Sequence, residues 1–228
     1  MANTAGYVRV DDAEREAERC RRENADGPAG LAEACARQGI GLVTFSSDLV
    51  FDGALGRPYV ESDPVNPINV YGRTKAEAER RVVAANPAAL IVRTSAFFGP
   101  WDAYNFVAIA LRELAAGRPF VAMSDGVASP TYVPDLVHTS LDLLIDGERG
   151  VWHLANVGAV SWLDFARHAA ALAGVPTDRL VGRPTAELGL AAPRPPTTPL
   201  ASERGTLLPP LEDALERFVE ERVPAAIG

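Results

Sequence analysis

The chain has 228 residues, of which 47% are apolar, and a mean hydropathy of zero, so it can bury a sizeable core. Its net charge of −8 excludes the broad basic face that sequence-independent nucleic-acid binding requires. No apolar run approaches the roughly 20 residues of a membrane span, and Cys20 and Cys35 are too few for a disulfide framework, so we expect a cytoplasmic protein without membrane contact.

The first half of the chain alternates predicted helices with short apolar strands. Residues 1–9 lack the basic and apolar regions of a signal peptide. Residues 11–23 have the charge pattern of an exposed helix, and Asp26 is expected to cap a second helix that ends at Gly39. The next expected elements are a buried strand over 40–46, a loop over 47–67, a helix over 70–85 and a buried strand over 88–94.

The second half continues the same alternation and contains no internal repeat. Its expected elements are helices over 104–116, 133–145 (beginning near Asp135), 161–174 and 211–221, strands over 120–123 and 150–154, and a proline-rich loop over 183–206. Ser161 is expected to cap the helix that follows it. Strands that alternate with helices predict an α/β fold with a Rossmann-like, doubly wound parallel sheet.

The glycine-rich turn that normally opens such a sheet is not found in this sequence. No G-x-x-G-x-x-G or G-x-G-x-x-G string follows a predicted strand, and Gly39 and Gly41 precede one. We therefore expect a Rossmann-like sheet that is truncated at its N-terminal side.

Tyr71 and Lys75 form a Tyr-x-x-x-Lys pair, the spacing that places two side chains one turn apart on a helix face. Lys75 is the only lysine among 22 lysine and arginine residues, which suggests a position that requires an ammonium group. A nearby ammonium would lower the pKa of the Tyr71 phenol, so that Tyr71 could deliver a proton to a carbonyl oxygen. An exposed helix pair is the alternative for this motif by itself.

Ser46 and Ser47 close the strand expected before that helix. Ligands of open parallel sheets bind beyond the carboxyl ends of the strands, so a hydroxyl there can hold the oxygen that Tyr71 protonates. An ordinary strand-ending turn is the alternative for the two serines. Serine, tyrosine and lysine in this order favour a reductase.

An ordered series of strings extends over nearly the whole chain. They are residues 3–7, 24–28, 46–53, 58–59, 66–67, 69–75, 92–95, 105–107, 129–132, 135–136 and 152–154. This series resembles the dTDP-4-dehydrorhamnose reductases, a family of extended short-chain dehydrogenases. The resemblance implies NAD(P)H-dependent reduction of a nucleotide-linked 4-keto-6-deoxy sugar, as in dTDP-rhamnose biosynthesis, with NADPH or NADH as cofactor.

The family's residue roles are implied at the matching positions. Tyr71 would donate the proton, Lys75 would bind the nicotinamide ribose, and Ser47 would orient the carbonyl group at C4 of the sugar. The catalytic set would be Ser47, Tyr71 and Lys75. The residues implied to bind the cofactor are Asn3, Thr4, Ala5, Tyr71 and Lys75, and those implied to bind the substrate are Ser47, Asp48, Ala96 and Asn105.

The resemblance also implies how the chain is divided. Residues 1–128 would form a partial Rossmann domain that binds NAD(P). Residues 129–228 would form mostly a smaller substrate-binding lobe, with a returning strand and a C-terminal helix. About 60 residues of the family's pattern are expected to be missing before Asn3, so the chain would be a fragment, a mis-called start, one part of a larger fused polypeptide or a truncated pseudoenzyme. A homo-oligomer is a further expected partner arrangement.

Departures from the family's strings leave the sugar open. Leu49 stands where the family has a tyrosine that faces the sugar, and Ala96 stands where it has a tryptophan. A sugar-nucleotide epimerase or dehydratase is one alternative, although dehydratases usually have a second acid where Leu49 follows Asp48. A non-catalytic regulatory protein of the same fold, like the beta subunit of methionine adenosyltransferase, is the other.

The remaining candidates are expected to be structural. Arg93, at the end of a buried strand, would either contact a phosphate or pair with an acid. Packing roles are expected for Trp152, Trp162 and Phe165, and surface or satisfied core positions for His138, His153 and His168, which share no metal-ligand spacing.

Overall fold

Four parallel strands form the central sheet of the structure, a computed structural model that describes residues 1–222. Side by side, they are β1 (Ala2–Asn3), β2 (Val43–Phe45), β3 (Leu90–Arg93) and β8 (Gly150–His153). The strands expected over 40–46, 88–94 and 150–154 are therefore present, although each is shorter than its apolar run. The prediction of an α/β fold with a parallel sheet is confirmed.

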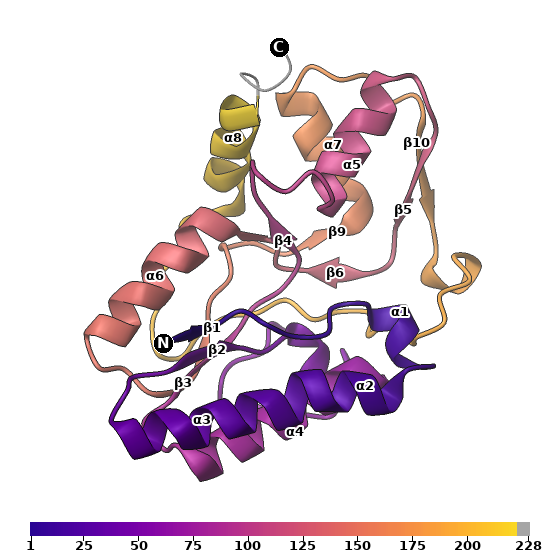
Figure 1. Cartoon of the computed structure of the whole chain (residues 1–228). Helices are drawn as coiled ribbons and strands as arrows, with labels where there is room; N and C mark the ends of the chain where they lie inside the picture. Colours follow the sequence, from indigo (N-terminus) through magenta and orange to yellow (C-terminus); the bar gives the residue numbers. More distant parts are fainter. Residues whose placement is uncertain (223–228) are drawn as a thin grey trace.

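Helices cover both faces of this sheet (Figure 1). Helices α3 (Gly27–Gln38) and α4 (Val70–Ala85) lie on one face, and α6 (Val133–Ile145) lies on the other. Because successive side chains of a strand point to opposite faces, Ile91 packs with α3 and α4, whereas Val92 packs with α6. Burial on both faces explains why β2 and β3 lie within continuous apolar runs of the sequence.

A second lobe packs further helices around an aromatic core. They are α5 (Phe106–Ala115), α7 (Trp162–Leu172) and α8 (Leu211–Arg222). Strand β5 (Phe120–Met123) pairs in parallel with β10 (Leu180–Arg183) beside these helices. The sequence predicted β5 but not its partner, and it did not place the pair outside the main sheet.

Short elements complete the chain. Two small ladders join β4 (Phe97–Phe98) to β7 (Thr131–Tyr132) and β6 (Val127–Ala128) to β9 (Val160–Ser161). Single turns of helix are η2 (Asp48–Val50) and η3 (Thr185–Glu187).

The N-terminal helices differ from expectation. Residues 11–23 do not form one exposed helix, because α1 (Val10–Ala13) and α2 (Ala17–Arg21) are separate and bury Cys20. Helix α2 continues through the π-helical turn η1 (Arg22–Asp26) directly into α3. Asp26 therefore has helical backbone and does not cap α3; its carboxylate instead accepts hydrogen bonds from arginines. Gly39 ends α3 in the left-handed conformation, as predicted.

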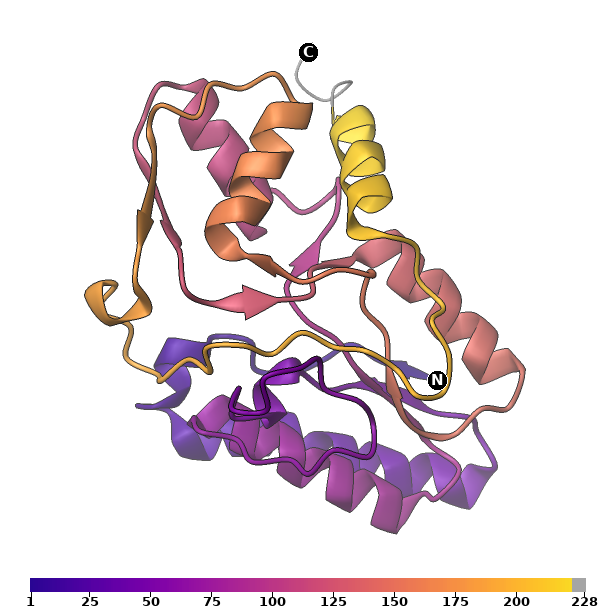
Figure 2. The ribbon, with the colours of Figure 1, turned by 180° about the vertical axis from the view of Figure 1, so that it is seen from behind.

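A long segment runs between the two lobes, and we call residues 192–203 the crossing segment (Figure 2). Its Arg194 bonds to Asp11, and Tyr59 forms a parallel bridge with Leu200. Helix α5 and strand β5 also belong to the second lobe, although they precede residue 128. Helix α5 packs against α7, and β5 pairs with β10.

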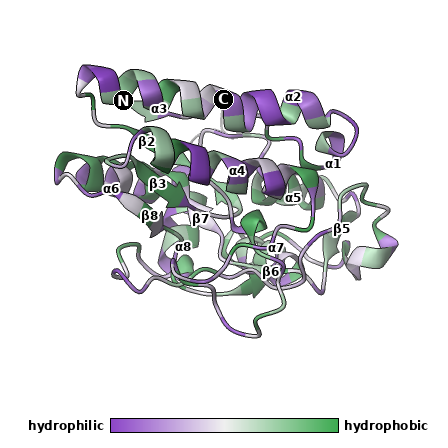
Figure 3. Cartoon of the chain, turned by 90° about the horizontal axis from the view of Figure 1, so that it is seen from below, coloured by the Kyte–Doolittle hydropathy of each residue, from purple (hydrophilic) through white to green (hydrophobic). Residues whose placement is uncertain are grey.

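The ribbon of α2 is coloured mostly as hydrophilic in Figure 3, whereas that of α3 alternates hydrophilic and hydrophobic residues. None of the helices within residues 1–222 combines the length and the apolar character that crossing a membrane requires. Cys20 and Cys35 are buried free thiols.

Candidate active site

Helix α4 presents Tyr71 and Lys75 at its first two turns, and the predicted bounds of this helix are confirmed. Asn69 caps it, because its side-chain oxygen accepts a hydrogen bond from the Gly72 N–H at 2.7 Å. Gly72 lies so close to the Leu49 carbonyl that an added Cβ would be 2.1 Å from the oxygen. This contact presses the start of α4 against the loop after β2, and so brings Tyr71 next to Ser47 and Asp48.

The two serines at the end of β2 have different partners. The Ser46 hydroxyl donates to the Glu79 carboxylate at 2.5 Å. The Ser47 hydroxyl donates to Asp48 Oδ1 at 3.1 Å and accepts from the Leu49 N–H at 3.1 Å. Both serines line a cavity, but the Ser46 hydroxyl is already bonded to a buried carboxylate, whereas the Ser47 hydroxyl lies beside the Tyr71 phenol. Ser47 is therefore the better candidate for holding a substrate oxygen.

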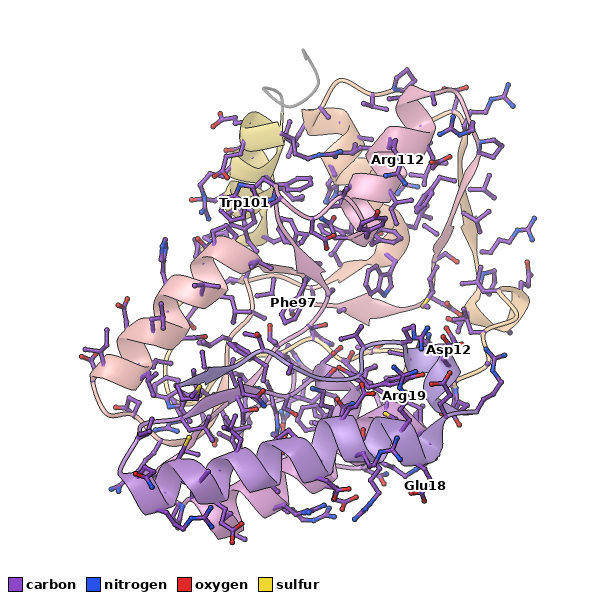
Figure 4. The ribbon with its side chains drawn as sticks, viewed as in Figure 1. Asp12, Glu18, Arg19, Phe97, Trp101 and Arg112 are labelled. Carbon is purple, nitrogen blue, oxygen red and sulfur yellow. The ribbon has the colours of Figure 1, made fainter. Side chains whose placement is uncertain are left out.

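A cavity of about 340 Å³ opens at the carboxyl ends of β2 and β3, between the two lobes. It contains four of the residues expected at the site: Ser47, Asp48, Tyr71 and Ala96. Further lining residues come from the second lobe and from the crossing segment, namely Met123, Gly126, Val127, Ala128, Trp162, Arg194, Pro195 and Thr198. Figure 4 shows Phe97, which also lines the cavity and is 49% exposed, between the lobes.

Burial changes the titration of both members of the Tyr71–Lys75 pair. Removal from water raises the pKa of Tyr71 well above its usual range, and the charge of Asp48 raises it further. The pKa of Lys75 falls to about 8, mainly because burial disfavours its charged form. The expected lowering of the Tyr71 pKa by Lys75 is therefore wrong for this structure, in which Lys75 Nζ lies 5.6 Å from the centre of the Tyr71 ring. A neutral phenol is the form that can donate a proton.

Asp48 is the only acidic residue within the described chain that lines the cavity. It is 7% exposed, and burial raises the pKa of its carboxyl group above the ordinary value. Thr198, in the crossing segment, donates a hydrogen bond to Asp48 Oδ2 at 2.7 Å. Asp48 thus joins the loop after β2 to the segment that closes the cavity.

Behind the cavity, Glu79 and Arg93 form a buried ion pair. Arg93 Nε lies 2.9 Å from one carboxylate oxygen of Glu79, and Nη2 lies 2.7 Å from the other. Of the two roles considered for Arg93, pairing with an acid is the one found. Glu79 lies on α4, one helical turn after Lys75, and Arg93 lies on β3, so their ion pair joins this helix to this strand. No local sequence pattern marked Glu79 as the partner of Arg93.

The N-terminal segment lies against Lys75. An added Cβ on Gly6 would be 3.7 Å from Lys75 Nζ and 2.8 Å from Asn24 Oδ1. The Asn24 side chain, buried in η1, accepts from the Tyr7 N–H at 2.8 Å and donates to the Tyr7 carbonyl at 3.1 Å. Within the described chain, Lys75 Nζ donates to a single acceptor, the Phe45 carbonyl at 3.1 Å.

These contacts fit the nicotinamide ribose expected at this place. Lys75 retains donors for hydroxyl groups, and the segment beside it is open to solvent, because Thr4 and Ala5 are exposed. The Asn3 side-chain amide donates to the Thr44 hydroxyl at 3.1 Å, and its side-chain oxygen Oδ1 accepts from the Ala5 N–H at 3.3 Å. The three residues expected to bind the cofactor, Asn3, Thr4 and Ala5, thus lie on one short stretch of chain.

Two of the expected substrate residues differ in where their side chains lie. Ala96 lines the cavity with a left-handed backbone, at φ 44°, which is uncommon for a residue other than glycine. Asn105 does not line the cavity, because its side chain caps α5 and bonds to the carbonyls of Gly99 and Asp102. The assignment of Asn105 to the substrate is therefore corrected to a structural role.

The other aromatic residues and the histidines mostly pack as expected. Trp152 and Phe165 are buried in the two cores, whereas Trp162 lines the cavity as well as packing on Phe106. His153 is buried and bonded to backbone carbonyls, which is the satisfied core position expected for a histidine. His138 and His168 are exposed, which is the expected surface position. The described residues contain no group of three or more histidine, cysteine or acidic side chains that could hold a metal.

Comparison with known proteins gives a consistent family. The model of the family described as RmlD substrate binding domain matches residues 1–222. The dTDP-4-dehydrorhamnose reductase of Mycolicibacterium smegmatis is 41% identical over 234 residues, which span all of this chain and 71% of that protein. The enzyme of the same name from Mycobacterium tuberculosis is 40% identical over 213 residues, 91% of this chain and 70% of that protein.

One solved structure has a closely similar fold. It is a dTDP-4-dehydrorhamnose reductase from Bacillus anthracis in complex with NADP, with a TM-score of 0.91 and 34% sequence identity. The match covers 96% of this chain and 79% of that one.

Proposed function

Because this chain belongs to the RmlD substrate-binding-domain family, we propose that it carries the catalytic centre of an NAD(P)H-dependent reductase of a nucleotide-linked 4-keto-6-deoxy sugar. The reaction would be the reduction named by its relatives, that of dTDP-4-dehydrorhamnose, in the formation of dTDP-rhamnose. The single observation that carries the proposal is that Ser47 and Tyr71 line one cavity at the carboxyl ends of the strands, with Lys75 one turn after Tyr71 on α4 and its Nζ 5.6 Å from the centre of the Tyr71 ring.

The three side chains would have different roles in reducing the keto group of the sugar. The Ser47 hydroxyl would hold the keto oxygen, and Tyr71 would donate its phenolic proton to that oxygen as the carbonyl is reduced. The cofactor, when bound, would supply the hydride that adds to the carbonyl carbon. Burial keeps the Tyr71 phenol protonated, because it raises the pKa of that group. Lys75 would hold the ribose through the N–H donors that its bond to the Phe45 carbonyl leaves free.

The substrate side of the cavity supports a sugar of moderate size. The cavity is about 340 Å³, and its far wall includes Phe97, Met123 and Trp162. Leu49 and Ala96 make the wall beside the serines apolar and small, so a deoxy sugar with a methyl group would fit it better than a fully hydroxylated one. We propose the cytoplasm as the location, which the free thiols Cys20 and Cys35 support.

Turnover is the direct test. The purified chain should consume NADPH when dTDP-4-dehydrorhamnose is added, and Tyr71→Phe should lower kcat by at least about 100-fold, because it removes only the transferred proton. Tyr104→Phe is the matched control, since Tyr104 is 85% exposed and does not line the cavity. Equal kcat for wild type and Tyr71→Phe would refute the proton-donor role.

A non-catalytic regulatory role would give a different result. A regulatory protein of this fold would show no NADPH consumption with any keto-sugar nucleotide, although it could bind one. A dehydratase would form a keto sugar rather than consume one, and among the described residues the cavity offers Asp48 as its only acid for that chemistry. Product analysis by mass spectrometry separates the three outcomes.

A further inference from the structure

The hydroxyl group of Ser47 has a single proton, and its hydrogen bond to Asp48 uses that proton. Ser47 Oγ donates to Asp48 Oδ1 at 3.1 Å and accepts from the Leu49 N–H at 3.1 Å. A serine hydroxyl has one O–H donor and two acceptor lone pairs. A keto oxygen can only accept a hydrogen bond, so it needs the same proton. While Asp48 is ionised, Ser47 therefore has no donor for the oxygen of the substrate.

Protonation of Asp48 would reverse the direction of this hydrogen bond. A protonated carboxyl group has one O–H donor, and a proton on Oδ1 would point to Ser47 Oγ across the same 3.1 Å. Ser47 Oγ would then accept from both Asp48 and the Leu49 N–H, which fills its two lone pairs. Its own proton would be free for a ligand in the cavity, without movement of any heavy atom.

The surroundings of Asp48 favour this protonated form. The residue is 7% exposed, and Arg194, the only basic residue among the described residues that line the cavity, pairs with Asp11 instead. Burial raises the pKa of Asp48, and the hydroxyl groups of Thr198 and Ser95 oppose that rise by hydrogen bonding to the carboxylate. Both of these partners are neutral, so neither supplies the positive charge that a buried carboxylate requires.

The other titratable groups around Asp48 come from α4 and from the crossing segment. Tyr71 faces it from α4, where the charge of Asp48 raises the pKa of Tyr71. Lys75, one turn later, has a pKa of about 8. Arg194 keeps its charge at any pH of interest, and the cavity residues of the second lobe do not titrate. A loss of activity with rising pH can thus come from Asp48 or from Lys75, and a test has to separate the two.

We propose that Asp48 is a positioning residue for the reduction and works in its protonated form, in which it donates to Ser47 and so directs the Ser47 proton to the keto oxygen. This role rests on the proposed function and adds one residue to it. Thr198 selects the oxygen that takes the proton, because its hydroxyl donates to Oδ2 at 2.7 Å and leaves Oδ1 for the bond to Ser47. Asp48 keeps its proton during the reaction, and Tyr71 remains the proton donor.

The test compares wild type with Asp48→Asn over a range of pH, and the measurement is kcat for NADPH consumption with dTDP-4-dehydrorhamnose. The asparagine amide can donate to Ser47 at every pH, while its oxygen still accepts from Thr198. The ratio of kcat in Asp48→Asn to kcat in wild type should therefore rise with pH by about tenfold or more, because only the wild-type carboxyl group loses its proton. Loss of the Lys75 proton affects both proteins equally and cancels in this ratio.

Asp52→Asn is the matched control. Asp52 lies in the same loop and also accepts hydrogen bonds from side chains, those of Tyr59 and Asn66, but it does not line the cavity. The ratio of kcat in Asp52→Asn to kcat in wild type should not change with pH.

Two further variants trace the effect to the proposed hydrogen bonds. In a Ser47→Ala background, Asp48→Asn should produce little rise in the ratio, because no hydroxyl is left to direct. Thr198→Val removes a bond that favours the ionised form of Asp48, so it should move the fall in kcat to higher pH than in wild type. A Thr198 that only fastens the crossing segment would lower kcat without this shift.

Three results would count against these assignments. A ratio that stays constant with pH, as a purely structural Asp48 would give, overturns the proposal. An equal rise in the Ser47→Ala background also overturns it, because the charge of Asp48 would then act on Tyr71 directly. If Asp48→Asn does not fold, an unshifted profile in Thr198→Val overturns it instead. Wild type that consumes no NADPH at any pH gives a distinct result, namely that the proposed function itself is wrong.

Discussion

Replacing Glu79 with glutamine tests the buried ion pair behind the catalytic residues. The side chains of Arg93 and Glu79 are only 6% and 8% exposed, and the two groups meet through two hydrogen bonds, of 2.9 and 2.7 Å. Ser46 donates to the same carboxylate at 2.5 Å. Glutamine keeps the shape but removes the negative charge, so the Arg93 guanidinium would be left buried without its counter-ion.

The expected loss of stability follows from this burial. Breaking a buried pair by removing one partner costs about 3–5 kcal/mol, because the remaining charge is uncompensated. Glutamine keeps one oxygen acceptor for Arg93 or Ser46, so we expect a loss of about 3 kcal/mol in the free energy of unfolding. Glu77→Gln is the control on the same helix: Glu77 pairs with Arg21 and Arg81, whose side chains are 46% and 37% exposed, and should cost no more than about 1 kcal/mol.

Urea unfolding with linear extrapolation measures these differences. The double variant Glu79→Gln/Arg93→Met should be no less stable than Glu79→Gln alone, because it also removes the uncompensated charge. Equal losses for Glu79→Gln and Glu77→Gln would refute the reasoning, since burial would then not decide the cost.

Three further predictions concern single residues. Lysine-selective carbon-13 labelling should give one side-chain NMR signal, that of Lys75, which titrates near pH 8; a midpoint near the usual ~10.4 would contradict its burial. Because the unfolded chain binds that proton up to about pH 10.4, the contribution of Lys75 should make the folded chain more stable as pH rises from about 8 to 10, and Lys75→Met should remove this contribution. Gly72→Ala should destabilise the fold and abolish turnover, because its Cβ would be 2.1 Å from the Leu49 carbonyl oxygen; an unchanged melting temperature would refute that close approach. Ser161→Ala should cost about 1 kcal/mol in urea unfolding, because it removes the cap bonded to the Asp164 N–H at 3.0 Å, and no loss would show that the cap is dispensable.

Local sequence was sufficient for most individual elements. The bounds of α4 were predicted to the residue, and α6 was located with its start placed slightly late, because each is a long amphipathic stretch with clear ends. Burial of a parallel strand on both faces requires a continuous apolar run, so β2 and β3 could also be located. The i, i+4 spacing alone was enough to place Tyr71 and Lys75 on one helix face.

Local sequence was not sufficient where distant contacts decide whether a helix starts or continues, or whether a short segment pairs as a strand. Asp26 followed by glycine and proline is typical of a helix start, but the chain continues through a π-helical turn, because the tertiary packing of α2 against α4 holds it there. Strand β10 was not predicted, since its partner β5 lies about 60 residues earlier and a two-stranded ladder has no strong pattern of its own.

The sequence by itself thus determined the order of helices and strands, the parallel α/β class, and the three residues proposed to carry the chemistry. The tertiary structure decided what surrounds those residues. It brought Arg194 and Thr198 to the cavity, paired Glu79 with Arg93, and committed Asn105 to a helix cap. It also reversed the expected shift in the pKa of Tyr71, because that pKa depends on burial and on charges brought together from distant parts of the chain. Local periodicity reports which face of an element is apolar, whereas desolvation and long-range pairing exist only after the elements have packed.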